Sequence, residues 1–563
     1  MSGVAMKETS PAWLMASSLL PIPVVASVIA FSLWVYDHAL GMYAAAGFGA
    51  LMVLFAITLR APAGPPSTLP DGIKGIRCYP YLGHSLQLIQ TWDTLQDWIV
   101  TMWETNGYKE FSIRLIKFGH FKNNGMVLCE PESVKHVLKD NFQNYVKGDA
   151  FYETLNDFLG NGIFATDGPV WKLHRKVATG MFSKKLLRNG TEAALAQAKK
   201  LLEKVDGYAA RGEAFDIQKM FYAFTMDVFS LIAFGVDLDS QNQPHEFANA
   251  FDRVQQISDL RMMNPFWKIR KMFKMFFSEE AILAKDCALM KAFAKTVISS
   301  KRRALSADKK SLGPDLISRF LTAAAKNNET VSDKELTDII LNFLIAGRDT
   351  TASALSWSIH EFIKNKDVNE KVVKEVRSAI AQVGGADASS IEKLEYEDTF
   401  KIVYSKLPYC RAAVSEVLRL HPSVPKDTKY AVKDDVLPNG TVVPAGCATI
   451  YTPYAMGRNP KLWPDPLKFD PERWLTKTAG GEDGATSIHK PTMVSDFVYP
   501  TFNAGPRLCL GRPLAFLEIQ LMLSLLLNKY TFEHAVPTTD EYKQSLVAPL
   551  KHGLLVKATK RVD

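Results

Sequence analysis

One cysteine near the end of the chain, Cys509, stands in a setting that could activate a thiolate. The segment 502–511 reads Phe-Asn-Ala-Gly-Pro-Arg-Leu-Cys-Leu-Gly, and an apolar helix pattern follows from Arg512 to Tyr530. A reactive thiolate needs positive charge and N–H donors nearby, and the start of that helix can supply both. Gly505 and Gly511 allow a close approach of a flat group or a turn with positive φ. A lone free cysteine is most often a small buried hydrophobe, so the neighbours at fixed offsets carry the prediction of a metal-ligating thiolate.

This segment matches a known family signature in full. Phe-x-x-Gly-x-Arg-x-Cys-x-Gly is the haem-binding motif of the cytochrome P450 family, which the chain therefore resembles. The resemblance implies haem b (iron protoporphyrin IX) with Cys509 as the axial ligand of iron, whose donated electron density favours O–O cleavage. Arg507 is placed to meet a haem propionate. The predicted cofactor-binding residues of this motif are Phe502, Gly505, Arg507, Cys509 and Gly511.

A second motif lies in the middle of the chain. Ser332 to Glu335 has the spacing of a capping box, and the apolar run from Leu336 to Trp357 predicts a long buried helix. The run contains Ala-Gly-Arg-Asp-Thr-Thr, residues 346–351. Glycine weakens a helix and threonine can bond back to its carbonyls, so we expect a local groove there. A helix end with solvated polar residues is the alternative, which the apolar flanks disfavour.

The same motif is similar to the Ala/Gly-Gly-x-Asp/Glu-Thr motif of the family. The resemblance assigns Thr350 as the oxygen-activating hydroxyl and Asp349 as the adjacent acid that supplies protons. Haem-thiolate isomerases and dehydratases, which use no dioxygen, often lack this threonine. The motif therefore favours monooxygenation over isomerisation or dehydration, and the lack of a regulatory module disfavours a non-catalytic haem sensor.

Two further motifs resemble structural parts of the family. Glu416 and Arg419 are three residues apart on one helix face, and the resemblance joins Arg473 to them in a buried charge network with a role in folding. Taken alone, such a pair is usually an exposed contact of little energetic value. Trp171 and Arg175 match Trp-x-x-x-Arg, share a helix face and can donate hydrogen bonds to haem propionates.

The substrate is the least determined feature. The apolar segment 151–164 lies where the family has a substrate-lining loop, although core packing explains its residues equally well. Together with the two long motifs, this segment looks most like the fatty-acid ω-hydroxylase branch of plants and microbial eukaryotes. We expect hydroxylation of a fatty acid at or near its terminal carbon, with a sterol or terpenoid as the alternative. The predicted pocket residues are Phe151, Phe158, Ala346, Val424, Val547 and Ala548.

The N-terminus predicts a membrane anchor. Residues 12–36 and 39–59 are nearly uncharged, and each stretch is long enough to cross a bilayer, for which about 20 residues suffice. One or two spans within residues 1–60 would be followed by a proline-rich connector, 61–70, and a catalytic domain, 71–563. Lys and Arg flank the pair of stretches but do not separate them, which favours a cytosolic catalytic domain. We expect the endoplasmic reticulum membrane as its location.

The composition indicates one large domain whose cysteines are in the thiol form. Of 563 residues 47% are hydrophobic, and the six cysteines form no C-x-x-C, so neither a zinc site nor a disulfide framework is expected. A formal charge of +8 argues against nucleic-acid binding. The chain has no Gly-x-Gly-x-x-Gly, so electrons must come from outside, which the resemblance assigns to NADPH-cytochrome P450 reductase. A group of cations could form a docking face for this reductase, and a solvated helix explains them equally well. They are Lys172, Lys176, Lys184, Lys185 and Arg188.

The predicted fold is mainly α with small β-sheets, as in the cytochrome P450 fold. Alternation from Phe111 to Cys129, around the turn-forming 122–125, predicts a β-hairpin. Helical periodicity dominates from Trp171 to Tyr404, and strand-like runs return at 442–451 and 553–558.

Overall fold

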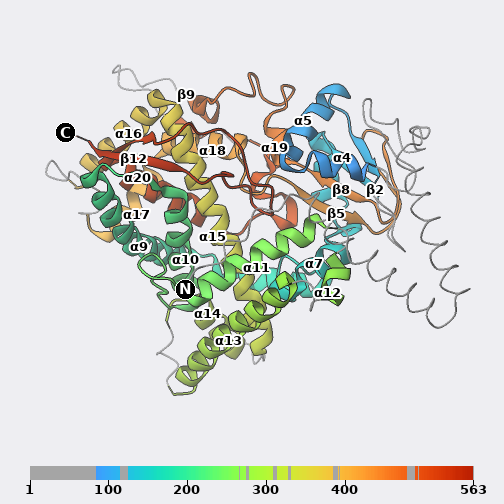
Figure 1. The fold of residues 1–563 in the computed structure, drawn as a ribbon, viewed down its shortest axis with the longest axis horizontal. Coiled ribbons are helices and arrows are strands. Elements are labelled where there is room, and N and C mark those ends of the chain that lie inside the picture. The colour runs from blue at the N-terminus through green and yellow to red at the C-terminus, as the bar shows by residue number, and fades with distance from the viewer. Residues whose placement is uncertain are drawn as a thin grey trace, which may run out of the picture.

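A computed structural model describes residues 84–114, 124–264, 267–273, 278–307, 313–326, 331–384, 391, 394–477, 489–491 and 494–561. The predicted anchor and connector lie outside these residues. Figure 1 shows the described part as a mainly helical body. The expected fold class, mainly α with small β-sheets, is confirmed.

Helices make up most of the body. They are α4 (Ser85–Gln90), α5 (Leu95–Thr105), α6 (Pro131–Lys135), α7 (Gly148–Leu159), α8 (Gly168–Met181), α9 (Lys184–Arg211), α10 (Ile217–Phe234), α11 (Glu246–Met263), α12 (Trp267–Met272), α13 (Ser278–Ala307), α14 (Leu316–Lys326), α15 (Asp333–Lys364), α16 (Lys366–Gly384), α17 (Tyr396–Ser405), α18 (Pro408–Leu420), α19 (Pro453–Gly457) and α20 (Arg512–Lys529). Short helical turns include η1 (Trp92–Thr94), η5 (Pro471–Trp474), η6 (Pro500–Phe502) and η7 (Gly505–Arg507).

The long helix α15 is the centre of the helical body. The predicted capping box is present, because Ser332 Oγ accepts from the Glu335 N–H and the Glu335 carboxylate accepts from the Ser332 N–H. Helices α10, α13, α18 and α20 pack against it. Gly347 permits the contact with α10, since a Cβ there would lie 1.8 Å from the Phe229 ring. This glycine therefore serves helix packing, which differs from the expectation that it shapes a groove.

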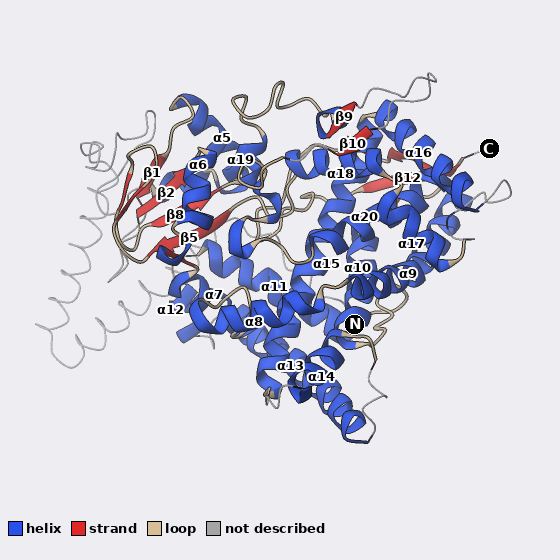
Figure 2. Ribbon diagram, turned by 180° about the vertical axis from the view of Figure 1, so that it is seen from behind, coloured by secondary structure: helices blue, strands red, loops and turns tan. Residues whose placement is uncertain are grey.

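Strands form two main sheets. Figure 2 shows β1, β2, β8 and β5 gathered at one end of the molecule. The five-stranded sheet has the order β1-β2-β8-β5-β3, and a three-stranded sheet has the order β11-β12-β4. Their bounds are β1 (Phe111–Arg114), β2 (Asn124–Leu128), β3 (Tyr145–Val146), β4 (Phe215–Asp216), β5 (Asp427–Ala431), β8 (Ala448–Tyr451), β11 (Tyr530–His534) and β12 (Leu555–Lys560). Two short ladders join β6 (Asp435–Val436) to β7 (Val442–Val443) and β9 (Leu475–Lys477) to β10 (His489–Pro491).

The predicted strands are present with shifted bounds. β1 and β2 pair antiparallel with Phe111 opposite Val127, which confirms the pairing, and Asn124 and Gly125, expected in the turn, lie in β2. The run 442–451 is two strands, β7 and β8, because Gly446 at φ +76° interrupts it. The last strand, β12, begins at Leu555 and continues to Lys560, where its pairing with β11 ends.

Helix α10 is the one described helix that is long and apolar enough to cross a membrane. It packs against α15 and α9, and most of its residues are buried inside the body. Its apolar character is therefore explained by its place in the core.

Candidate active site

Hydrogen bonds fold the segment around Cys509 into a compact loop before α20. The Cys509 N–H donates to Phe502 O (2.8 Å), and the Leu508 N–H donates to Gly505 O (3.0 Å). Gly505 has φ +61°, and a Cβ there would lie 2.2 Å from Leu138 O, so this position requires glycine. The Phe502 ring packs at 5.4 Å from Phe516 of α20, which fixes the loop on the helix.

Cys509 differs from the other cysteines that the structure describes. All five are free, and Cys509 alone is exposed, whereas Cys129, Cys287, Cys410 and Cys447 are buried. Although part of its surface is accessible, protein surrounds the Cys509 thiol, and this desolvation raises its pKa, while the N–H groups of Gly511 and Arg512 and the charge of Arg175 lower it. The net effect is a raised pKa, so the donors expected at the start of the following helix offset the desolvation only in part.

Cations gather on one side of this loop. Arg507 forms an ion pair with Asp167 (2.6 Å), and Lys147 and Lys429 pair with Asp427 at 2.5 and 2.7 Å. Burial would raise the pKa of Asp427, but Lys147 and Lys429 hold it well below its usual range.

Trp171 and Arg175 of α8 join the same cluster. Arg175 Nη2 donates to Leu508 O (2.5 Å), and the Arg507 guanidinium stacks over the Trp171 ring at 4.5 Å. The predicted propionate donors Trp171, Arg175 and Arg507 are thus brought together around the cysteine loop.

The charges of this cluster fit a haem. The four basic side chains Arg175, Arg507, Lys147 and Lys429 outnumber the two carboxylates of Asp167 and Asp427, although burial lowers the pKa of Lys429 to about 7. Arg507 Nε is buried and makes no hydrogen bond within the described residues. The two propionates of haem b would balance these charges and could accept from such donors. Sequence reasoning missed Lys147 and Lys429, because the partner that connects them, Asp427, lies far from Lys147 in the chain.

Helix α15 has one accessible patch. From Leu336 to Phe362 every residue is buried except Ala346 and Thr350, which lie one turn apart on one face. Thr350 Oγ1 donates to Ala346 O (2.6 Å), which is the back-bonding expected from the sequence. The expected local opening in the helix is therefore formed by these two residues, which we call the α15 patch.

Asp349 lies on a different side of α15 from the patch. Its carboxylate is fully buried and receives a hydrogen bond from Arg348 (3.0 Å). Arg348 also pairs with Asp252 of α11 (2.5 Å), whose side chain is 55% exposed. Burial raises the pKa of Asp349 to about 6, against the charge of Arg348. Asp349 Oδ2 makes no hydrogen bond of ordinary geometry within the described part of the chain.

Two distant segments are fixed to α15 beside the patch. Ser423 Oγ donates to Thr350 O (2.8 Å), which brings the neighbouring Val424 toward the patch. Ala548 O accepts from Ser353 Oγ (3.2 Å) and from Trp357 Nε1 (2.9 Å). The Ala548 N–H donates to Ser423 O (2.9 Å), so the two segments also bind each other. These bonds hold the segment of Val424 at Thr350, whereas Val547 and Ala548 are buried beside Ser353 and Trp357.

The predicted apolar segment 151–164 is divided between the core and a strap on α15. Phe158 of α7 is buried and packs edge-on against Phe251 at 5.3 Å, so it is a core residue rather than a pocket wall. Phe151 is partly accessible, with the Lys147 ammonium 4.6 Å from its ring.

The strap, residues 160–164, is held by two polar side chains of α15. The Asn161 N–H donates to Asp338 (2.9 Å), and the Phe164 N–H donates to Asn342 (3.1 Å). A Cβ on Gly162 would lie 1.8 Å from the Asn342 amide, so the close contact needs glycine. Sequence reasoning missed both polar residues, because they look like interruptions of an apolar helix.

The predicted network of Glu416, Arg419 and Arg473 is present and buried. The Glu416 carboxylate accepts from Arg419 Nε and Nη2 (both 2.8 Å) and from Arg473 Nε (2.9 Å). Trp474 Nε1 and the Asp470 N–H complete five hydrogen bonds to this carboxylate, each at 2.9 Å. The network therefore connects α18 to η5, beside the cysteine loop.

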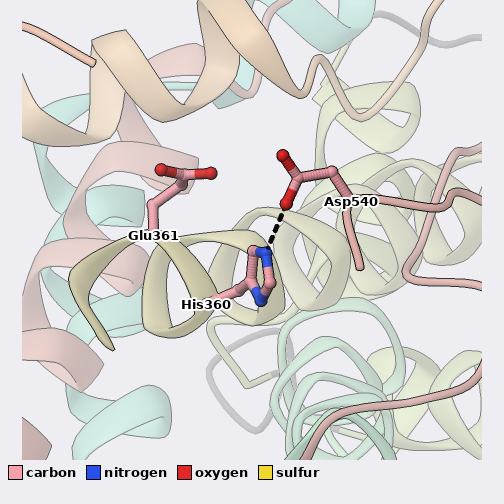
Figure 3. A group of neighbouring side chains, drawn as sticks. All are labelled: His360, Glu361 and Asp540. Carbon is pink, nitrogen blue, oxygen red and sulfur yellow. Dashed lines mark hydrogen bonds and ion pairs between the residues drawn. The ribbon is translucent and has the colours of Figure 1, made fainter. Parts of the chain in front are cut away.

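A second group of possible metal ligands lies at the end of α15. Figure 3 shows His360 bonded to Asp540, with Glu361 on the same helix turned toward them. Lys364 already binds both carboxylates, at 2.8 Å from Asp540 and 3.0 Å from Glu361. Burial would raise the pKa of Glu361, but His421 and Lys364 lower it to about 2. The lysine supplies the positive charge that a metal ion would bring, so the group is explained as an ion-pair network.

Comparison with known proteins agrees with this site. The family model described as Cytochrome P450 matches residues 74–556. The chain is 30% identical to Cytochrome P450 704B1 of Arabidopsis thaliana over 87% of its own length and 95% of that protein. It is 34% identical to Cytochrome P450 704C1 of Pinus taeda, over 77% and 84% of the two chains. It is also 34% identical to Cytochrome P450 monooxygenase cyp1 of Mycosarcoma maydis, over 77% and 68%. The chain belongs to the cytochrome P450 family of monooxygenases.

Proposed function

We propose that this protein hydroxylates a lipophilic substrate, a fatty acid at or near its terminal carbon, with dioxygen and electrons from NADPH. Haem held by Cys509 would supply the activation of dioxygen. The observation that carries the proposal is the α15 patch, because it exposes a hydroxyl-bearing turn of an otherwise buried helix. Val424 and Val547, on the two segments bound to this helix, supply apolar side chains beside it.

The residues of the site have different proposed roles. Cys509 would hold the haem through its thiolate, and Arg507, Trp171 and Arg175 would donate hydrogen bonds to the propionates. Thr350 presents its hydroxyl oxygen at the patch, since its proton is used in the bond to Ala346 O. Burial raises the pKa of Asp349 to about 6, but its carboxylate is bonded to Arg348 on another side of the helix, so it must leave Arg348 and turn toward the patch to supply a proton to Thr350.

Membrane location and electron supply belong to the same proposal. Residues 1–60 would anchor the protein in the endoplasmic reticulum membrane, with the catalytic domain in the cytosol. NADPH-cytochrome P450 reductase would deliver electrons at the cationic face of α8 and α9. Lys172, Lys176, Lys184 and Lys185 are exposed there, which supports a site for an acidic partner.

Microsomes that carry the protein and a reductase test this proposal. They are supplied with NADPH and a panel of saturated fatty acids and sterols, and products are identified by mass spectrometry. We expect hydroxylated fatty acids that require NADPH. A hydroxylated sterol without fatty-acid products would assign the alternative substrate class, and a rearranged or dehydrated product formed without NADPH would overturn the monooxygenation.

A further inference from the structure

One enclosed lysine, Lys426, has no counter-charge among the described residues. It lies directly before β5 and is only partly accessible. Burial lowers the pKa of this amine to about 8. Within the described residues it makes no hydrogen bond or ion pair, and its ammonium lies 5.0 Å from the centre of the Trp92 ring. The neighbouring Lys429, in contrast, pairs with Asp427.

Lys426 lies between the two parts of the active site. Ser423, three residues before it, binds Thr350 O of the α15 patch. Asp427, the next residue, belongs to the cation cluster beside the cysteine loop. Three residues span at most about 11 Å, so the backbone of Lys426 is close to that of Ser423. The backbone of Lys426 is therefore close to the segment that binds Thr350, while its ammonium lies over Trp92.

The environment of this ammonium suits an anion from outside the chain. An ammonium partly removed from water without a partner is unfavourable, and a bound carboxylate would offset that cost. The Trp92 ring adds a cation–π contact, and Trp92 Nε1 is buried without a hydrogen-bond partner in the described structure. A sterol or a hydrocarbon would leave the ammonium unpaired. A lipid with a free carboxylate would pair with it while its tail points toward the patch.

We propose that Lys426 binds the carboxylate of the substrate, so that the enzyme selects free carboxylic acids over their esters. This inference rests on the proposed function, and it names the end of the fatty acid that the protein recognises. Trp92 flanks the carboxylate and limits its access to water.

Binding of matched ligands to the purified holoenzyme tests the role of Lys426. Dodecanoic acid and its methyl ester are titrated, and dissociation constants are read from the change in the haem absorption spectrum. We expect the wild type to bind the acid at least about tenfold more tightly than the ester, since a hydrogen bond to a charged group has about that value. Lys426→Gln should abolish this preference by weakening the acid alone, and Lys426→Arg should retain it.

Lys461→Gln is the matched control. Lys461 also lies over an aromatic ring, 5.3 Å from the centre of Tyr108, but it is exposed and donates to Gly107 O. We expect it to bind both ligands as the wild type does. Equal binding of acid and ester by the wild type overturns the inference even if Lys426→Gln fails to fold. An equal loss of both ligands in Lys426→Gln also overturns it, because that result indicates a structural role.

The titration also separates this inference from the proposed function. If both the acid and the ester bind without preference, the role of Lys426 is wrong and fatty-acid oxidation is still supported. If neither ligand changes the spectrum while a sterol does, the fatty-acid substrate itself is wrong.

Discussion

Replacement of Glu416 by glutamine should be among the most damaging conservative changes in this protein. The carboxylate receives five hydrogen bonds, and the side chains of Glu416 and Arg419 are fully buried. Glutamine keeps the shape but removes the charge, and its NH₂ group would face N–H donors. Loss of one partner from a buried ion pair costs about 3–5 kcal/mol, because the remaining charge is left uncompensated. We therefore expect the free energy of unfolding to fall by about this amount.

Urea unfolding of the purified holoenzyme measures this loss, with tryptophan fluorescence and haem absorbance as probes. Glu472→Gln is the control. Glu472 lies in η5 next to Arg473 and pairs with Lys371 at 2.9 Å, and the side chains of Glu472 and Lys371 are 40% and 53% exposed. An exposed pair of this kind contributes about 0–1 kcal/mol. If Glu416→Gln lost no more stability than Glu472→Gln, the reasoning about the buried network would be refuted.

Three other changes test the site itself. Thr350→Ala should lower product formed per NADPH consumed by roughly 100-fold, the lower range for a lost proton-transfer group, whereas Thr350→Ser should retain most of it; equal coupling in both would contradict the role of the hydroxyl. The pKa of Asp349 is raised from 3.8 to about 6, so the product formed per NADPH consumed should fall as pH rises through about 6. The stability contributed by the protonated carboxyl is present below about pH 3.8 and is lost as pH rises through about 6. If Asp349→Asn has the same pH profile as the wild type, Asp349 is not the group that titrates. Gly505→Ala should reduce haem content, because its Cβ would meet Leu138 O at 2.2 Å, whereas Gly446→Ala, also at positive φ but with open space around it, should bind haem normally.

The sequence predicted those features whose determinants are close together in the chain. The capping box at Ser332, the bond of Thr350 to Ala346 and the pairing of Glu416 with Arg419 all depend on residues three or four apart. Helical geometry alone brings such residues into contact. The helical fold class follows for the same reason.

Contacts between distant segments could not be predicted in this way. The sequence places Phe158 in the pocket, but α11 covers it with Phe251. The sequence also favours a groove at Gly347, yet this residue faces Phe229 of α10. The type of a residue limits the side chains that can pack against it. Which helix or strand supplies those side chains depends on the whole fold. The contacts of Phe158 and Gly347 therefore could not be predicted from their own segments.

The hydrogen bonds around Ser423 show why substrate selection is the least local property of this chain. Ser423 binds Thr350 through its hydroxyl and Ala548 through its carbonyl, so one residue fixes three segments relative to one another. Lys426 follows on the same segment, and its position relative to the patch is therefore set by these bonds. Thr350 lies in a recognisable motif, but Ser423, Lys426 and Ala548 do not. The motifs of the site are thus local in the chain, whereas the proposed recognition of the substrate depends on loops that only the folded chain brings together.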